Sequence, residues 1–132
     1  MTLQDCFEKV LDSESPLDEL EKTIWEQLTE ASQLPEHPWS LGSVATVSAQ
    51  NSPSPSPNCR TVVLRQTDAT QRSIDFFTDV RSEKIRQIRS AASVCWLMYD
   101  RESRIQLRLD GTATVIDDEE ADRAWENTPL HS

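Results

Sequence analysis

The spacing of apolar residues changes near residue 40, and this change separates a helical part of the chain from a part built of strands. Before that point apolar residues recur every three to four positions, which is typical of helices that bury one face. The first such stretch begins at Thr2-Leu3-Gln4-Asp5, a segment that is typical of a helix start. The residues expected on its buried face are Leu3, Phe7 and Val10.

A second helix is predicted from Ser15-Pro16 to about Gln33. Serine favours the capping position, and proline suits the first turn because its missing N–H would have no helical partner there. Pro35 and Pro38 end the pattern, since proline cannot continue a helix interior. The stripe expected to be buried consists of Leu17, Leu20, Ile24, Leu28 and Ala31.

From Ser40 onward β-branched and alternating residues predict strands. The segment Asn51–Asn58, with its Ser-Pro repeat, is expected to be a long hairpin connection. The alternative is a phosphorylation or docking segment. The predicted strands are Val44–Val47, Arg60–Gln66, Ser73–Thr78, Val94–Tyr99 and Arg104–Ile116, with helices over Asp79–Ser90 and from Glu119 to Trp125. The pattern favours an α+β fold on a small antiparallel barrel.

The length of 132 residues suits one domain, and we expect residues 1–132 to form it. Within it, residues 1–38 hold the N-terminal helices, 40–116 the barrel strands, and 117–132 the start of a C-terminal helix. The hydrophobic fraction of 36% is low for a compact monomer, which is a hint of a dimer.

The net charge of −10 is distributed unevenly. Residues 1–59 carry ten acids and two bases, residues 60–108 six acids and ten bases, and residues 109–132 seven acids and one base. An acidic protein repels nucleic-acid phosphates, so we expect no nucleic-acid partner. The local excess of arginine fits one small anion, and ordinary surface salt bridges are the alternative.

Several classes of site are excluded or disfavoured by composition. The only glycines are Gly42 and Gly111, so neither a dinucleotide-binding nor a P-loop motif is possible. Two histidines and three dispersed cysteines give no metal spacing and no nucleophile system, so no metal is expected. Neither a membrane span nor a signal peptide is evident. The three dispersed cysteines favour a reducing cytoplasm over a secreted disulfide scaffold. Any difficult chemistry would therefore come from a bound cofactor.

Three segments offer groups that could hold such a cofactor. Arg60–Arg65 is an apolar strand with arginines in opposite phase, and the guanidinium fork suits bidentate contact with phosphate. Phe77–Lys84 joins a strand to a helix start, where free N–H groups accompany Arg81, Ser82 and Lys84, unless Asp79 or Ser82 merely caps the helix. On Arg104–Gly111 the amide of Gln106 suits a flavin edge, although any half-exposed strand carries polar residues.

The order and spacing of these three segments resemble the pyridoxamine 5'-phosphate oxidase-like FMN-binding split-barrel family. The similarity runs from about Ser43 to Trp125. The Thr-Asp-x-Arg-Ser-x-Lys motif most resembles the uncharacterised bacterial and cyanobacterial branch of this family. The helix that carries Trp25 is similar to that branch as well. The resemblance implies a split barrel, FMN as the cofactor, and a homodimer with FMN at its interface.

The resemblance also implies a role for each matching residue. Arg60 and the backbone through Arg65 would line the FMN phosphate and ring, and Gln106 would reach the ring edge from the second subunit. Arg65 also matches a position that touches the substrate phosphate in the vitamin B6 oxidases. The implied cofactor-binding residues are Arg60, Thr61, Val62, Val63, Leu64, Arg65, Phe77, Thr78, Arg81, Ser82, Lys84 and Gln106.

Two departures from the family pattern limit what the resemblance implies. Glu83 stands where the oxidases proper usually have a phosphate-binding arginine, and Arg81 is the neighbour that could supply the charge. Family members continue past the position of Ser132 with residues for flavin and substrate, so we expect an incomplete substrate pocket. The expected function is an FMN-dependent oxidoreductase of unknown substrate and unknown catalytic residues. The alternative is a non-catalytic module that binds FMN or another anion as a carrier or sensor.

Overall fold

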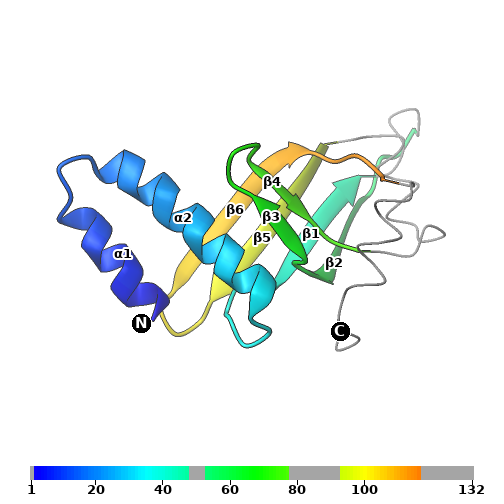
Figure 1. Cartoon of the computed structure of the whole chain (residues 1–132). Helices are drawn as coiled ribbons and strands as arrows, with labels where there is room; N and C mark the ends of the chain where they lie inside the picture. Colours follow the sequence, from blue (N-terminus) through cyan, green and yellow to red (C-terminus); the bar gives the residue numbers. More distant parts are fainter. Residues whose placement is uncertain (1, 48–52, 78–92, 117–132) are drawn as a thin grey trace. The chain divides into compact units, whose positions relative to one another are not determined.

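The structure is a computed structural model that describes residues 2–47, 53–77 and 93–116. In these ranges two helices and six strands are present, which confirms the predicted α+β class (Figure 1). The chain divides into two compact units. The first unit comprises Met1–Gly42, Leu64–Phe76 and Met98–Leu107, and the second comprises Ser43–Val63, Phe77–Leu97 and Arg108–Ser132.

The first helix, α1 (Leu3–Leu11), begins at the predicted position. The Thr2 hydroxyl accepts a hydrogen bond from the Asp5 N–H, and the Asp5 carboxylate accepts one from the Thr2 N–H, which makes a capping box. Leu3 and Val10 are buried, and the Phe7 ring lies 5.9 Å from the fully buried Trp39 ring. The face predicted from the spacing is therefore the face that packs.

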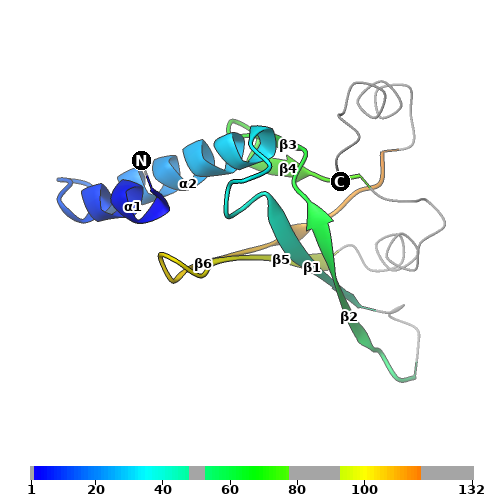
Figure 2. The same cartoon turned by 90° about the horizontal axis from the view of Figure 1, so that it is seen from below.

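The second helix, α2 (Pro16–Gln33), has the predicted bounds, although Ser15 makes no side-chain capping bond. Leu28 and Ala31 are buried as expected, at 0% and 2% exposure. Leu17 is 81% exposed, so its predicted burial is wrong. It lies in the first turn, at the end of α2 that is farthest from β3 (Gln66–Asp68) and β4 (Ser73–Asp75) (Figures 1 and 2). Periodicity identifies the face of a helix but not how far the packed surface extends along it.

Strands β3 and β4 form an antiparallel hairpin that packs on α2 in the first unit (Figure 1). The hydroxyl oxygens of Thr29 and Thr67 lie 2.9 Å apart across this contact. Asp68 accepts hydrogen bonds from the N–H groups of Thr70 and Gln71, and this turn allows Arg72 its positive φ of 54°. The hairpin thus holds the strand segment against the helix.

A four-stranded sheet has the order β2-β1-β5-β6. β1 and β5 are antiparallel, and in the second unit Val44 is opposite Trp96 and Ala45 is opposite Cys95. The side chains of Val44, Thr46, Val62 and Trp96 are buried. The strands of this sheet are β1 (Leu41–Val47), β2 (Pro57–Val63), β5 (Ser93–Asp100) and β6 (Ile105–Thr112).

Several strand boundaries differ from the predicted ones. β1 begins three residues before Val44, and β2 begins at Pro57 inside the predicted loop. The predicted strand Arg60–Gln66 is split, because β2 ends at Val63 and β3 begins at Gln66. β4 ends at Asp75, and β6 ends at Thr112. Alternation of residues continues through such breaks, so a pattern in the sequence cannot locate them.

The predicted helices Asp79–Ser90 and Glu119–Trp125 lie outside the described residues. Closure of the strands into a split barrel and the organisation as one domain stay predictions. None of the helices in the described part of the chain has the length and apolar character needed to cross a membrane.

Candidate flavin phosphate site

Strand β2 presents Arg60 on its buried side, as the alternation of the sequence predicts. Arg60 is half-buried, Val62 is 6% exposed, and Leu64, just after the strand, is 1% exposed. Thr61, in the opposite phase, is exposed, whereas Val63 and Arg65 are half-buried. The predicted pairing of Arg60 with the phase of Val62 and Leu64 is confirmed. The strand therefore brings a guanidinium group into partly desolvated surroundings, where contacts with an anion gain strength.

A hydrogen bond to a buried hydroxyl holds this guanidinium group. Arg60 Nη1 donates to Thr46 Oγ1 at 2.7 Å, and Thr46 on β1 is 1% exposed. Among the described residues this is the one hydrogen bond of the Arg60 side chain, which has five N–H donors. Within the described part of the chain, the other donors of the fork have no hydrogen-bond partner. Sequence reasoning missed Thr46, although its phase with the apolar Val44 was a usable signal.

The segment after β2 is fixed through its backbone in the first unit. The Leu64 N–H donates to the Ser40 carbonyl and the Arg65 N–H to the Asp75 carbonyl, both at 2.9 Å. These two N–H groups are therefore already hydrogen-bonded within the protein. Any contact of Leu64 or Arg65 with a ligand would use the side chain or the carbonyl oxygen instead.

The predicted cofactor-binding residues are divided between the two units and the residues outside the description. Phe77 is half-buried and belongs to the second unit, as do Arg60, Thr61, Val62 and Val63. Gln106 is exposed on β6 and belongs to the first unit, together with Leu64 and Arg65. The predicted residues Thr78, Arg81, Ser82 and Lys84 lie outside the described residues.

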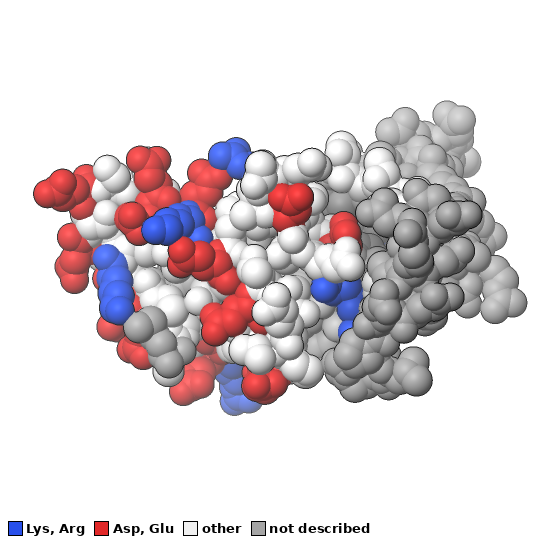
Figure 3. Space-filling view, in the orientation of Figure 1, with Lys and Arg blue, Asp and Glu red and all other residues white. Residues whose placement is uncertain are grey.

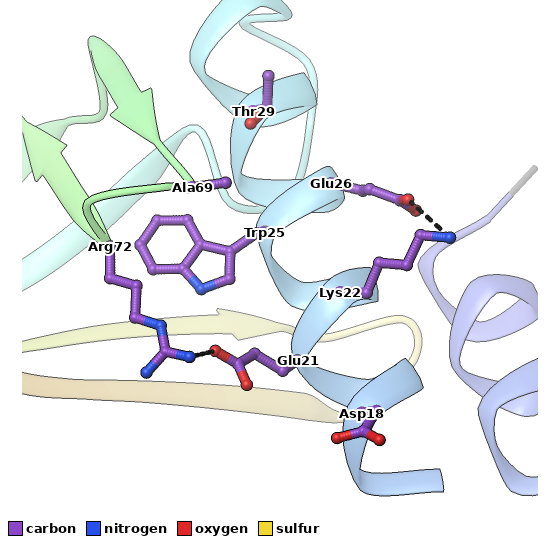
Figure 4. A pocket seen from close by; sticks show the side chains of 8 residues that line it. All are labelled: Asp18, Glu21, Lys22, Trp25, Glu26, Thr29, Ala69 and Arg72. Carbon is purple, nitrogen blue, oxygen red and sulfur yellow. Dashed lines mark ion pairs between the residues drawn. The ribbon is translucent and has the colours of Figure 1, made fainter. Parts of the chain in front are cut away.

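A shallow pocket of about 630 Å³ lies between α2 and the β3–β4 turn (Figure 4). Two of its carboxylates are paired with bases, Glu21 with Arg72 at 2.5 Å and Glu26 with Lys22 at 4.0 Å. Its lining residues are Asp18, Glu21, Lys22, Trp25, Glu26, Thr29, Ala69 and Arg72. With three acids against two bases, this pocket is a poor site for a phosphate.

The described cysteines are free thiols. Burial raises the pKa of Cys95, with the nearby Asp110 carboxylate acting in the same direction, and burial also raises the pKa of Cys6. Raised pKa values keep both groups as thiols, the form that is the weaker nucleophile. Among the described residues no group of three or more His, Cys, Asp and Glu side chains could hold a metal ion.

Comparison with known proteins matches this fold and strand pattern to an FMN-binding domain. The family model described as pyridoxamine 5'-phosphate oxidase, FMN-binding domain, matches residues 21–117. This range includes Thr46, Arg60 and Gln106. The chain therefore belongs to the pyridoxamine 5'-phosphate oxidase family of FMN-binding domains. FMN is the cofactor of the domain that it matches.

Individual relatives agree with this assignment. A pyridoxine/pyridoxamine 5'-phosphate oxidase of Rubrobacter xylanophilus is 34% identical over 88 residues, which cover 67% of this chain and 40% of the relative. The protein of the same name in Burkholderia thailandensis is 31% identical over 109 residues, covering 83% of this chain and 47% of the relative. The chain thus spans less than half the length of these curated relatives.

A solved structure supports the same fold. It is described as a pyridoxamine 5'-phosphate oxidase-related, FMN binding protein of Nostoc punctiforme, with 25% sequence identity and a TM-score of 0.61. The similarity covers 79% of this chain and 56% of that chain.

The residues present around Arg60 fit the phosphate of FMN. The Arg60 guanidinium group supplies the charge, and the hydroxyl that holds it is neutral. No carboxylate is bonded to Arg60 among the described residues, so its positive charge is not cancelled there. A guanidinium group held by a neutral hydroxyl is suited to binding an anion.

Proposed function

We propose that this chain binds FMN through a phosphate contact of Arg60 and acts as a flavin oxidoreductase of unknown substrate. The observation that carries the proposal is the half-buried Arg60 guanidinium group, fixed by Thr46 inside the segment that matches the FMN-binding domain. FMN, when bound, supplies a ring that accepts a hydride from a reduced substrate. The residues of this chain bind and orient the cofactor and exclude water from it.

Each predicted residue has a defined role in this proposal. Arg60 binds the phosphate, and the segment Thr61–Arg65 lines the cofactor along β2 and just after it. Phe77 and Thr78 contact the flavin, Ser82 and Lys84 hold the phosphate, and Arg81 adds positive charge to it. Gln106 reaches the ring edge from a second copy of the chain, and Arg65 is the candidate for a substrate phosphate. These roles rest on the family pattern.

A homodimer is part of the proposal. Leu41 and Tyr99 are each 54% exposed in the first unit, and Val47 is 38% exposed in the second. Large apolar side chains that are exposed on strands gain free energy when a second subunit covers them. We place the protein in the cytoplasm, in agreement with its three free cysteines.

The charge distribution does not favour a nucleic-acid partner. Acidic side chains are numerous over α1 and α2 (Figure 3), and the chain has a net charge of −10. Such a surface repels a polyphosphate backbone at long range. The anion that the chain binds is therefore a small one, held locally at Arg60.

The visible spectrum of the purified protein tests the proposed function. Bound flavin gives a yellow protein, and FMN added to apoprotein would change its absorbance and fluorescence on binding. A colourless protein that takes up no FMN would exclude the proposal. With flavin bound, reduction by an amine or by reduced nicotinamide with steady reoxidation indicates an enzyme, whereas lack of turnover indicates the alternative, a carrier or sensor module.

A further inference from the structure

Thr46 carries a buried hydroxyl group on a side of β1 that also holds the buried, apolar Val44. It is 1% exposed on β1, and Val44 on the same side of the strand is 0% exposed. A buried hydroxyl costs free energy unless it is hydrogen-bonded, so an apolar residue of similar shape would be the simpler choice for stability alone. The Thr46 hydroxyl oxygen accepts a 2.7 Å hydrogen bond from Arg60 Nη1.

The kind of partner that Arg60 has distinguishes it from two other arginines. Arg72 is paired with Glu21, and Arg108 is paired with Asp110 at 3.3 Å. A carboxylate partner fixes a guanidinium group but also cancels its charge. A hydroxyl partner fixes the group and leaves the charge in place. The arrangement at Arg60 is thus suited to holding a cation ready for an external anion.

Holding the Arg60 side chain in place before the ligand binds is expected to increase the affinity for that ligand. Arginine has a long, flexible stem, and ordering it on ligand binding costs conformational entropy. A hydrogen bond that already exists before the ligand arrives removes part of that cost. Because the bond uses one end of the fork, it also determines the direction in which the remaining N–H donors point.

We infer that Thr46 is a positioning residue, which orders the Arg60 guanidinium group for the phosphate and so favours phosphorylated over unphosphorylated flavin. This inference rests on the proposed function and adds to it a residue from the neighbouring strand. Thr46 acts through Arg60 and touches neither the flavin ring nor the substrate in this account.

Isosteric substitution tests the inference. Thr46→Val removes the hydroxyl and keeps the shape, Thr46→Ser keeps the hydroxyl, and Thr23→Val is the control for removal of a buried hydroxyl from α2 (Thr23 is 9% exposed). FMN and riboflavin are titrated against each apoprotein by flavin fluorescence. We expect Thr46→Val to weaken FMN binding about three- to tenfold. Thr46→Ser and Thr23→Val are expected to stay within about twofold of the parent chain.

The combination with Arg60→Ala separates a positioning role from a structural one. If Thr46 acts through Arg60, Thr46→Val in the Arg60→Ala background causes no further loss of FMN affinity. A general structural effect would lower FMN affinity in both backgrounds and would lower riboflavin affinity as well. If Thr46→Val does not fold, Thr46→Ala replaces it in the same double-mutant cycle with Arg60→Ala.

The outcomes keep the two proposals distinguishable. Unchanged FMN affinity in Thr46→Val, while Arg60→Ala loses affinity, would overturn the positioning role and leave the FMN site intact. Equal losses for FMN and riboflavin, or additive losses in the double variant, would overturn it too. Failure of the parent chain to bind FMN, or an Arg60→Ala variant with full affinity, would remove the phosphate site itself.

Discussion

His37 Nε2 lies 3.0 Å from Gln27 Oε1, and the backbone N–H of Trp39 donates to His37 Nδ1 at 2.9 Å. Because Nδ1 accepts, the ring proton is on Nε2, which donates to the amide of Gln27. Gln27 Nε2 in turn donates to Cys6 Sγ at 3.5 Å. One buried glutamine thus connects α1, α2 and the segment before β1 in the first unit, and the connection requires a neutral imidazole.

Stability is expected to fall in mild acid because of His37. Burial lowers the pKa of His37 below its ordinary 6.5, although Glu30 and Asp100 act in the opposite direction. The unfolded chain then binds a proton that the folded chain rejects, so stability decreases as pH falls from about 6.5 toward the folded-state pKa. Protonation of Nδ1 would also break the bond from Trp39. Urea unfolding at pH 7.5 and pH 5.5 measures the effect.

His37→Asn is the control for this pH dependence. It removes the titration while the rest of the chain, His131 included, is unchanged. We expect a smaller difference between the two pH values in the variant than in the parent chain. An equal difference in both proteins would assign the acid sensitivity to other groups.

Arg60→Ala is expected to weaken FMN binding by roughly 1–3 kcal/mol, because a charged hydrogen bond to the phosphate is lost. Arg72→Ala is a matched control, since Arg72 is an arginine of the acidic pocket that is paired with Glu21. Its affinity for FMN is expected to match that of the parent chain. Fluorescence titration gives both constants, and equal losses in the two variants would mean that overall charge, not a site, governs binding. Lys84→Ala should reproduce the Arg60→Ala loss.

The two leucines of α2 that share a predicted face are expected to differ widely in their effect on stability. Leu28 is 0% exposed, so Leu28→Ala removes buried methyl groups and leaves a cavity, at a cost of about 2–5 kcal/mol. Leu17 is 81% exposed, and Leu17→Ala is expected to change the free energy of unfolding by less than about 0.5 kcal/mol. Urea unfolding of both variants checks the contrast, and similar losses would contradict the burial of this helix.

The elements that the sequence predicts well are those whose signals are local. The bounds of α2 follow from Ser15-Pro16 at its start and Pro35 after its end, and the side on which Arg60 lies follows from strand alternation. Strand alternation places Thr46 on the side of Val44, but its contact with Arg60, 14 residues further along the chain, is not visible in the sequence. The break between β2 and β3 was missed for the same reason, since the bonds of Leu64 and Arg65 go to Ser40 and Asp75. Contacts between distant segments decide these features.

The three thiols are expected to react at different rates. Cys59 is exposed on β2, whereas Cys6 and Cys95 are half-buried. The pKa values of Cys6 and Cys95 are raised, chiefly by burial, so each has less of the reactive thiolate at a given pH. A disulfide reagent at pH 7.5 should therefore label Cys59 in a fast phase and the other two more slowly. Cys59→Ser should remove the fast phase alone, and its persistence in that variant would show that access to Cys6 or Cys95 is greater than their burial implies.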